Sequence, residues 1–206
     1  RCIVLCSDGK HFCAGANFGK DRDMQDKADP YSDLYSQAVR LFKNKKPVIA
    51  AVQGGAIGGG LGLSLVADFR IGCPESRFSA NFSRLGFHQG FGTTVTLPRV
   101  IGPQNAAMMM LTGRRLKGQE AFDIGLIDYL VPLKEVRSKA IELAEEISEA
   151  GPLAVQSIRA TIRAGLAEQV EEIVSWELSE QVRLQSTKDF KEGIKASLER
   201  RKPKFE

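Results

Sequence analysis

Residues 47–73 decide the fold, and they read PVIAAVQGGAIGGGLGLSLVADFRIGC. Residues 47–52 form a short, continuously apolar run, which is typical of a strand that is buried on both faces. A glycine-rich turn follows at residues 54–60, then an apolar segment at 61–66 that suits a buried helix, and then a second apolar strand at 69–73. The order strand, glycine turn, helix and strand predicts a βαβ unit with parallel strands and a right-handed connection.

The glycine run is expected to direct backbone N–H groups at a ligand above the start of the helix. A phosphate suits such donors, and so does a carbonyl oxygen that becomes an oxyanion. A phosphate loop would need lysine and then serine or threonine after its last glycine, but Leu61 and Gly62 stand there. The acidic residue of a dinucleotide fingerprint is also missing from the end of the next strand. The glycines could instead serve only to let helix and strand pack closely. A role in binding an oxyanion and a role in packing therefore both stay open.

The flanking segments extend this unit into an α/β core followed by helices. Residues 1–6 resemble a buried strand at the very start of the chain, so we expect an N-terminally truncated chain whose leading strands are missing. We assign residues 1–132 to the core and residues 133–206 to a C-terminal helical region. Residues 75–92 are expected to be irregular. Apolar spacing predicts helices at 31–42, 93–100, 104–111, 118–125, 135–150, 153–166, 170–184 and 189–200, and a short strand at 129–131.

The composition is that of an ordinary globular protein and excludes several classes of function. Of 206 residues, 43% are hydrophobic and 26% charged, and the net charge of +4 is too small to argue for a nucleic-acid partner. The four cysteines match no zinc spacing, and with two histidines we expect no metal site. No apolar run is long enough to cross a membrane. Reduced cysteines in apolar surroundings favour a cytoplasmic location.

Residues 11–17 (HFCAGAN) and 46–60 (KPVIAAVQGGAIGGG) resemble the F-x-A-G-A-D and K-P-x-I-A-A-v-x-G-x-A-x-G-G-G segments of the crotonase (enoyl-CoA hydratase/isomerase) superfamily. Three further stretches are similar to that family: ADFRI at 67–71, LTG at 111–113 with residues 121–131, and the C-terminal residues 189–205. The resemblance covers nearly the whole chain. It implies a crotonase-like (ClpP/crotonase) α/β fold, a spiral of ββα units with a C-terminal helical trimerisation or cap region.

The resemblance also implies a ligand and a site. The family binds a CoA thioester as its substrate, without another cofactor, and assembles as a homotrimer or a dimer of trimers. By position, the two oxyanion-hole N–H groups fall on Ala16 and Gly59. Glycine suits this role because it brings its N–H close to a ligand without a clash from Cβ. The substrate contacts that we assign with them are Ala14, Asn17, Gly58, Phe82, Gln89 and Phe91, of which Asn17 replaces the family's usual aspartate.

The proton-transferring glutamates of the family's hydratases are missing. Their positions correspond to Gly62 and Phe82, and neither residue can transfer a proton. His88 lies in the loop where the family carries catalytic side chains, and histidine titrates near neutral pH, so we take it as the candidate acid or base. A structural histidine that satisfies a backbone carbonyl is the competing interpretation. Phe82 and Phe91 either line an acyl pocket or simply pack.

Three functions fit these residues. The first is an acyl-CoA-processing enzyme of the enoyl-CoA hydratase/isomerase type that stabilises a thioester enolate. The second is a catalytically silent acyl-CoA-binding or scaffold subunit, which the replacements Gly62 and Phe82 favour. The third is a histidine-dependent hydrolase that cleaves a C–C bond of a β-diketone without CoA. Lys10 and the C-terminal basic residues are candidates for contacts with CoA phosphates, although a solvated helix face also explains such a cluster.

Overall fold

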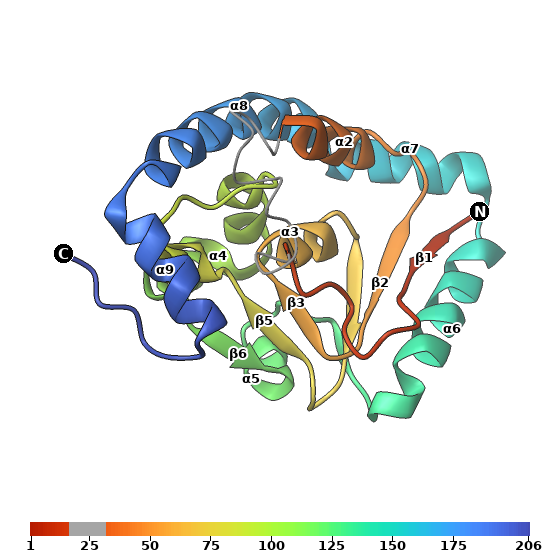
Figure 1. Ribbon diagram of the computed structural model, residues 1–206. Helices are drawn as coiled ribbons and strands as arrows, with labels where there is room; N and C mark the ends of the chain where they lie inside the picture. The colour runs from red at the N-terminus through yellow and green to blue at the C-terminus, as the bar shows by residue number, and fades with distance from the viewer. Residues whose placement is uncertain (17–31) are drawn as a thin grey trace.

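The computed structural model describes residues 1–16 and 32–206, and the larger of its sheets is parallel and four-stranded (Figure 1). The strand order is β1 (Ile3–Leu5), β2 (Val48–Val52), β4 (Phe69–Gly72) and β7 (Tyr129–Leu130). β2 pairs with β4 in parallel, and helix α3 (Gly59–Leu65) lies between them in the chain. The βαβ unit that residues 47–73 predict is therefore confirmed.

A second sheet of three strands explains how the chain winds. It contains β3 (Gly55–Ile57), β5 (Arg77–Ser79) and β6 (Arg115–Lys117), in that order. The chain passes from β2 in the first sheet to β3 in the second and then into α3. It repeats this course from β4 to β5 and into the 3-10 helix η1 (Asn81–Leu85) and α4 (Thr93–Thr112). This repeated turn is the ββα spiral that was expected.

Two predictions from the sequence were wrong in part. Residues 54–60 are not a simple glycine turn, because they contain strand β3, and residues 75–92 are not irregular, because they contain β5 and η1. Strands β3, β5 and β6 have three residues each, which is too short for an alternating pattern to be visible. Their pairing partners come from other turns of the spiral, so only the tertiary structure creates these strands.

The predicted helices are confirmed with small shifts of their ends. α4 is interrupted at Gly102, whose φ of 76° and ψ of 158° are not helical. The interruption lies between the two helices that the sequence predicts at 93–100 and 104–111. The other helices are α2 (Ser32–Phe42), α5 (Gly118–Asp123), η2 (Leu133–Glu135), α6 (Val136–Glu149), α7 (Pro152–Ile162), α8 (Leu166–Gln185) and α9 (Lys188–Leu198).

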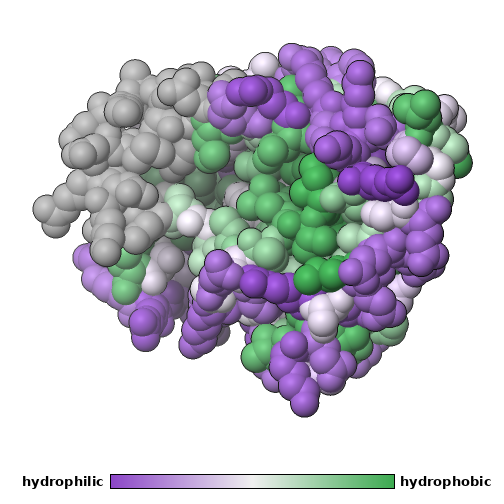
Figure 2. All heavy atoms as spheres, turned by 90° about the vertical axis from the view of Figure 1, so that its right-hand side faces the viewer, coloured by the Kyte–Doolittle hydropathy of each residue, from purple (hydrophilic) through white to green (hydrophobic). Residues whose placement is uncertain are grey.

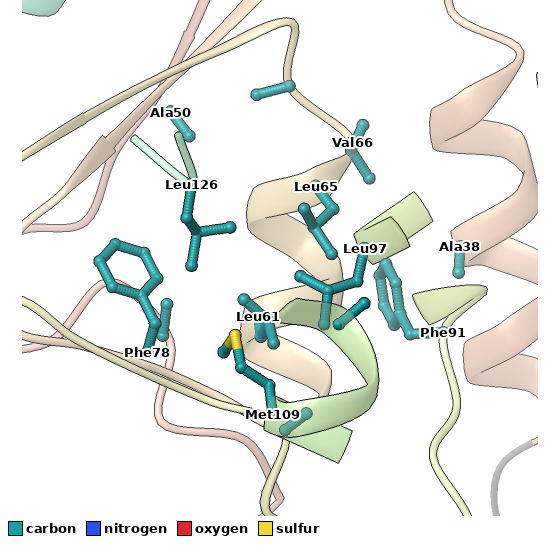
Figure 3. Packing of buried hydrophobic residues seen from close by; sticks show 14 of the residues in the cluster. Ala38, Ala50, Leu61, Leu65, Val66, Phe78, Phe91, Leu97, Met109 and Leu126 are labelled. Carbon is teal, nitrogen blue, oxygen red and sulfur yellow. The ribbon is translucent and has the colours of Figure 1, made fainter. Parts of the chain in front are cut away.

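The parallel sheet is buried on both faces, as its apolar strands require. On one face, α6 covers Ile49 and Ile71. On the other face, Leu61 and Leu65 of α3 pack with Leu97 and other side chains of α4, as Figure 3 shows. The result is a rigid core that fixes the end of β3 and the beginning of α3, where the glycine run lies.

The last helix returns to the core of its own chain. α9 packs on η1, and the rings of Phe87 and Phe190 meet edge to face with centroids 5.2 Å apart. Ser197 of α9 lines the same cavity as the glycine run. The C-terminal helix therefore contributes one residue, Ser197, to the lining of the candidate site.

Helix α7 has an apolar face that the described residues leave uncovered. Leu153, Ile158 and Ile162 are 81%, 60% and 66% exposed, although their spacing is that of a buried helical face. Figure 2 views the side of the molecule that carries α6, α7 and β1, and apolar residues gather at its centre within a hydrophilic surround. Exposed apolar patches of this kind are typical of surfaces that bind other proteins.

Candidate active site

Two loops that are distant in sequence are joined beside the start of α3. Cys13 forms a parallel bridge with Ala56, in which its N–H donates to the carbonyl of Gly55 and its carbonyl accepts from Ile57 N–H, both at 3.0 Å. Gly60 must be a glycine here, because any Cβ would overlap the carbonyl of Cys13. This pairing holds residues 14–16 against residues 57–59.

A cavity of about 540 Å³ opens beside the joined loops. Ala14, Gly15, Ala16, Gly58 and Gly59 contribute backbone to its wall. Its other lining side chains are mainly apolar, and the aromatic ones are Phe82, Phe87 and Tyr35. Exposed charged residues lie at its mouth, namely Lys10, His11, Glu75 and Arg115, together with the half-buried Arg77. The cavity thus combines a charged mouth with an apolar interior.

Gly59 is the first residue of α3, so helix geometry gives its N–H no partner within the helix. None of the hydrogen bonds found among residues 1–16 and 32–206 uses the N–H groups of Ala16 or Gly59. An added Cβ on Gly59 would meet no atom within 4 Å, which shows that the space above this residue is open. Two backbone donors therefore border the same cavity.

The structure brings some of the predicted site residues together and not others. Ala14, Ala16, Gly58, Gly59 and Phe82 all line the cavity. Asn17 lies outside the described residues. His88, Gln89 and Phe91 are not among the residues that line the cavity.

Phe91 points into the core and not toward the ligand space. Its backbone has a φ of 64°, which is rare for a bulky residue, and its side chain is only 5% exposed. A Cβ on Gly62 would lie 2.7–2.8 Å from Cβ, Cγ and Cδ1 of Phe91. The phenyl ring therefore occupies the volume that a side chain at position 62 would need.

Gln89 and His88 bond to their own loop. The Gln89 amide donates to Thr94 Oγ1 at 3.1 Å, and His88 Nδ1 lies 2.8 Å from the carbonyl oxygen of Gln89. His11 is exposed, and its Nδ1 accepts a hydrogen bond from Gly55 N–H. The ring of His11 therefore helps to hold β3 in place.

Two buried polar residues of α8, Glu177 and Gln181, hold the loop at residues 88–94 in place. Glu177 accepts hydrogen bonds from Gly92 N–H at 2.7 Å and from both the N–H and the hydroxyl of Thr94. Gln181 donates to the carbonyl of His88 and accepts from the hydroxyl of Tyr35. No pattern in the sequence singled out Glu177, Gln181 or Tyr35. Their signal was weak but present, because Glu177 and Gln181 continue the buried spacing of Val170 and Val174.

Burial gives Glu177 a pH-dependent effect on stability. Desolvation raises the pKa of this carboxyl above its ordinary value of 4.5, against the opposing effect of its hydrogen bonds from Thr94 and Gly92. The folded chain therefore binds this proton more tightly than the unfolded chain. The stabilisation is complete below about pH 4.5 and is lost as the pH rises through the folded-state pKa.

We therefore expect Glu177→Gln to remove a decline in the free energy of unfolding that the parent chain shows above about pH 4.5. Urea denaturation at a series of pH values measures the free energy of unfolding of each variant. Glu180→Gln is the matched control on the same helix, because the Arg183 side chain lowers the pKa of Glu180 and its contribution has the opposite slope. Parallel pH curves for the parent chain and Glu177→Gln would contradict the assignment.

Two of the C-terminal basic residues are paired with acids of their own region. Arg201 binds Glu192 and Glu199, and Lys188 binds Glu206. Over residues 1–16 and 32–206, no cluster of three or more His, Cys, Asp or Glu side chains is arranged to hold a metal ion. No helix in the same part of the chain is long and apolar enough to span a membrane.

The family model for enoyl-CoA hydratase/isomerase matches residues 1–206. The chain belongs to this family. It is 35% identical to a crotonyl-CoA hydratase of Syntrophomonas wolfei over 205 residues, which cover 98% of the chain and 79% of that protein. It is also 35% identical to the enoyl-CoA hydratase EchA19 of Mycobacterium tuberculosis, with 100% and 79% covered.

Solved structures agree with this assignment. An enoyl-CoA hydratase/isomerase from Pseudoalteromonas atlantica has a TM-score of 0.88 at 26% identity, with 100% of the chain and 82% of that structure covered. An enoyl-CoA hydratase from Bacillus anthracis has a TM-score of 0.74 at 34% identity, with 100% and 81% covered. Both the superfamily and the crotonase fold that the motifs predict are therefore confirmed.

Proposed function

We propose that this chain is an acyl-CoA-processing enzyme that stabilises a thioester enolate with the N–H groups of Ala16 and Gly59. The observation that carries the proposal is the convergence of these two donors on one cavity through the Cys13–Ala56 bridge. When an enolate forms, negative charge develops on the thioester oxygen. Fixed N–H donors stabilise such a charge without reorganisation, and one donor contributes on the order of 3–4 kcal/mol.

The cavity also suits the two ends of an acyl-CoA. Its interior offers Phe82, Phe87 and Leu85 to an acyl chain, and the rings of Phe82 and Phe87 pack 5.6 Å apart. Its mouth offers Lys10, Arg115 and Arg77 to phosphates. Arg77 also donates to the carbonyls of Pro74 and Ser76, which orient its guanidinium. No other cofactor is needed for enolate chemistry of this kind.

The two N–H donors do not specify which reaction of the family the chain catalyses. The family's hydratases transfer protons with two glutamates, and the corresponding positions here are Gly62 and Phe82. Phe91 fills the space beside Gly62, so position 62 has no room for a carboxylate side chain. We expect turnover with a panel of enoyl-, dienoyl- and β-keto-CoA thioesters that includes crotonyl-CoA. Turnover of none of them, together with no calorimetric binding of any thioester, would refute the proposal.

One alternative has an observation in its favour. A silent acyl-CoA-binding subunit would keep the two N–H donors and lose the glutamates, as this chain does at Gly62 and Phe82. Binding of thioesters without turnover of any would identify that case. The histidine-dependent β-diketone hydrolase receives no support from the geometry, since His88 does not line the cavity. Failure to bind CoA esters, with cleavage of a β-diketone, would revive it.

We further propose that the chain assembles as a homotrimer or a dimer of trimers, with the apolar face of α7 in the interface. Light scattering after gel filtration should give three or six times the mass of the 22.6 kDa chain. Ile158→Glu with Ile162→Glu should give the mass of one chain, because two charges would be buried unpaired. Phe122→Glu on α5, a 43% exposed residue, is the matched control and should keep the assembly. An unchanged mass for the α7 variant would place the interface elsewhere.

A further inference from the structure

Asn81 brings a free amide into the cavity of the candidate site. It is the first residue of η1, it lines the cavity, and it is half-buried. Its side chain forms no hydrogen bond with another residue within the described ranges 1–16 and 32–206. An amide has two N–H donors and an acceptor oxygen. Both the donors and the acceptor of Asn81 are therefore available to a ligand.

The other polar side chains that line the cavity are bonded elsewhere or lie at its edge. The hydroxyl of Tyr35 donates to the buried Gln181. Ser197 is exposed, and the charged lining residues form the mouth. Among the lining residues that the structure describes, Asn81 is therefore the neutral polar side chain whose hydrogen-bonding groups are free.

The pairing of β3 with β5 brings position 81 beside the start of α3. The two strands are parallel, with Ile57 opposite Ser79. Gly59 and Asn81 each lie two residues beyond that pair, at the same end of the sheet. Gly58 N–H donates to the carbonyl of Ser79 at 2.9 Å, which continues the pairing past the ends of the strands. The sheet therefore fixes where Asn81 lies relative to the glycine run.

The amide of Asn81 lies against the residue that precedes the Gly59 donor. A Cβ on Gly58 would lie 3.3 Å from Oδ1 of Asn81 and 3.7 Å from Cζ of Phe82. Gly58, Asn81 and Phe82 all line the cavity. The amide oxygen thus adjoins both the donor region and the phenyl ring that we assign to the acyl chain.

This position decides which part of an acyl-CoA the amide meets. With the thioester oxygen at Gly59 N–H and the acyl chain against Phe82, the carbons nearest the thioester pass Asn81. Enolate formation uses the α-carbon, so the β-carbon is the next position that can carry an oxygen. A plain hydrocarbon chain would displace water from the amide without replacing its hydrogen bonds, and this loses affinity. An oxygen on the β-carbon would replace them.

We propose that Asn81 is a specificity-determining residue of this site, whose amide hydrogen-bonds to an oxygen on the β-carbon of the acyl group. The proposal rests on the function proposed above and narrows its substrate class. The amide can donate to a keto oxygen, and it can both donate to a hydroxyl and accept from it. The site therefore prefers 3-hydroxyacyl- and 3-ketoacyl-CoA thioesters to the saturated thioester of the same length.

Calorimetric titration with butyryl-CoA, 3-hydroxybutyryl-CoA and acetoacetyl-CoA tests this preference, because the three acyl groups differ only at the β-carbon. The parent chain should bind the two oxygenated esters at least about fivefold more tightly than butyryl-CoA. Asn81→Leu, which replaces the amide by an apolar group of similar size, should bring the three dissociation constants within about twofold of one another. Its dissociation constant for butyryl-CoA should stay within about threefold of the parent chain's or fall.

Asn105→Leu is the matched control, because it makes the same chemical change on α4 at a residue that does not line the cavity. It should keep the full preference for the oxygenated esters. Asn81→Leu breaks no side-chain hydrogen bond within the described chain, so circular dichroism should show it folded. If it does not fold, Asn81→Ala removes the amide without adding volume and should abolish the preference in the same way.

Equal binding of all three esters by the parent chain would overturn the proposal and leave acyl-CoA binding intact. An undiminished preference in a folded Asn81 variant would overturn it as well, and so would loss of the preference in Asn105→Leu. A parent chain that binds none of the three thioesters would instead refute the proposed function itself.

Discussion

Replacing Gly59 by proline is expected to lower kcat toward an acyl-CoA thioester at least about 100-fold while the chain stays folded. Proline lacks the N–H that we assign to the oxyanion hole. The fold should tolerate it, because Gly59 is the first residue of α3 and proline is favoured at that position. The cavity side of Gly59 is also open, with no atom within 4 Å of an added Cβ. The substitution therefore removes one donor and little else.

Gly59→Ala is the matched control for this prediction. Alanine retains the N–H and adds a methyl group into the same open space. We expect its kcat to stay close to that of the parent chain, and thermal melting should show both variants folded. If Gly59→Pro turns over as well as Gly59→Ala, the oxyanion is not bound at this position. If both lose activity equally, the added atoms block the substrate, and the N–H is not the cause.

The second large effect is expected at Gly62, where alanine should destabilise the chain by about 2–3 kcal/mol. Its Cβ would lie 2.7 Å from Cβ of Phe91, which is closer than carbon atoms can pack. Phe91 cannot easily withdraw, because the adjacent Gly92 N–H is bonded to the buried carboxyl of Glu177. For a chain of this size, the melting temperature should fall by roughly 4–12 °C.

The sign of this effect should reverse once the ring of Phe91 is gone. Phe91→Gly alone should destabilise the chain, because it leaves a cavity in the core. The loss is partly offset, because glycine adopts the positive φ of position 91 without strain. In that background, Gly62→Ala should be neutral or stabilising by up to about 1 kcal/mol, since alanine is the better helix former. A double-mutant cycle by urea denaturation measures the coupling. Additive changes would mean that the two residues do not compete for one volume.

Gly59→Ala also serves as the stability control for this cycle. It makes the same chemical change in the same helix, α3, at a position where the structure leaves room. It should cost far less than Gly62→Ala. The comparison separates the clash with Phe91 from any general intolerance of α3 toward side chains.

The sequence alone determined the parallel sheet, the helices and the family. Long apolar runs such as residues 47–52 and helices with clear spacing carry strong local signals, because burial of their own side chains decides their structure. The motifs at residues 11–17 and 46–60 identified the loops that line the cavity. The paired donors Ala16 and Gly59 followed from those motifs.

The tertiary structure alone decided which side chains enter the cavity. Phe91 and His88 lie in the expected loop. A positive φ at Phe91, a hydrogen bond from Gly92 to distant Glu177 and one from distant Gln181 to His88 turn that loop away from the ligand space. No sequence motif singles out Tyr35, and only the tertiary structure shows that its hydroxyl donates to Gln181 of α8. The direction of a side chain depends on partners far away in the sequence, and local patterns carry no information about those partners. The sequence therefore specified the backbone of the site, and packing between distant elements decided which side chains line it.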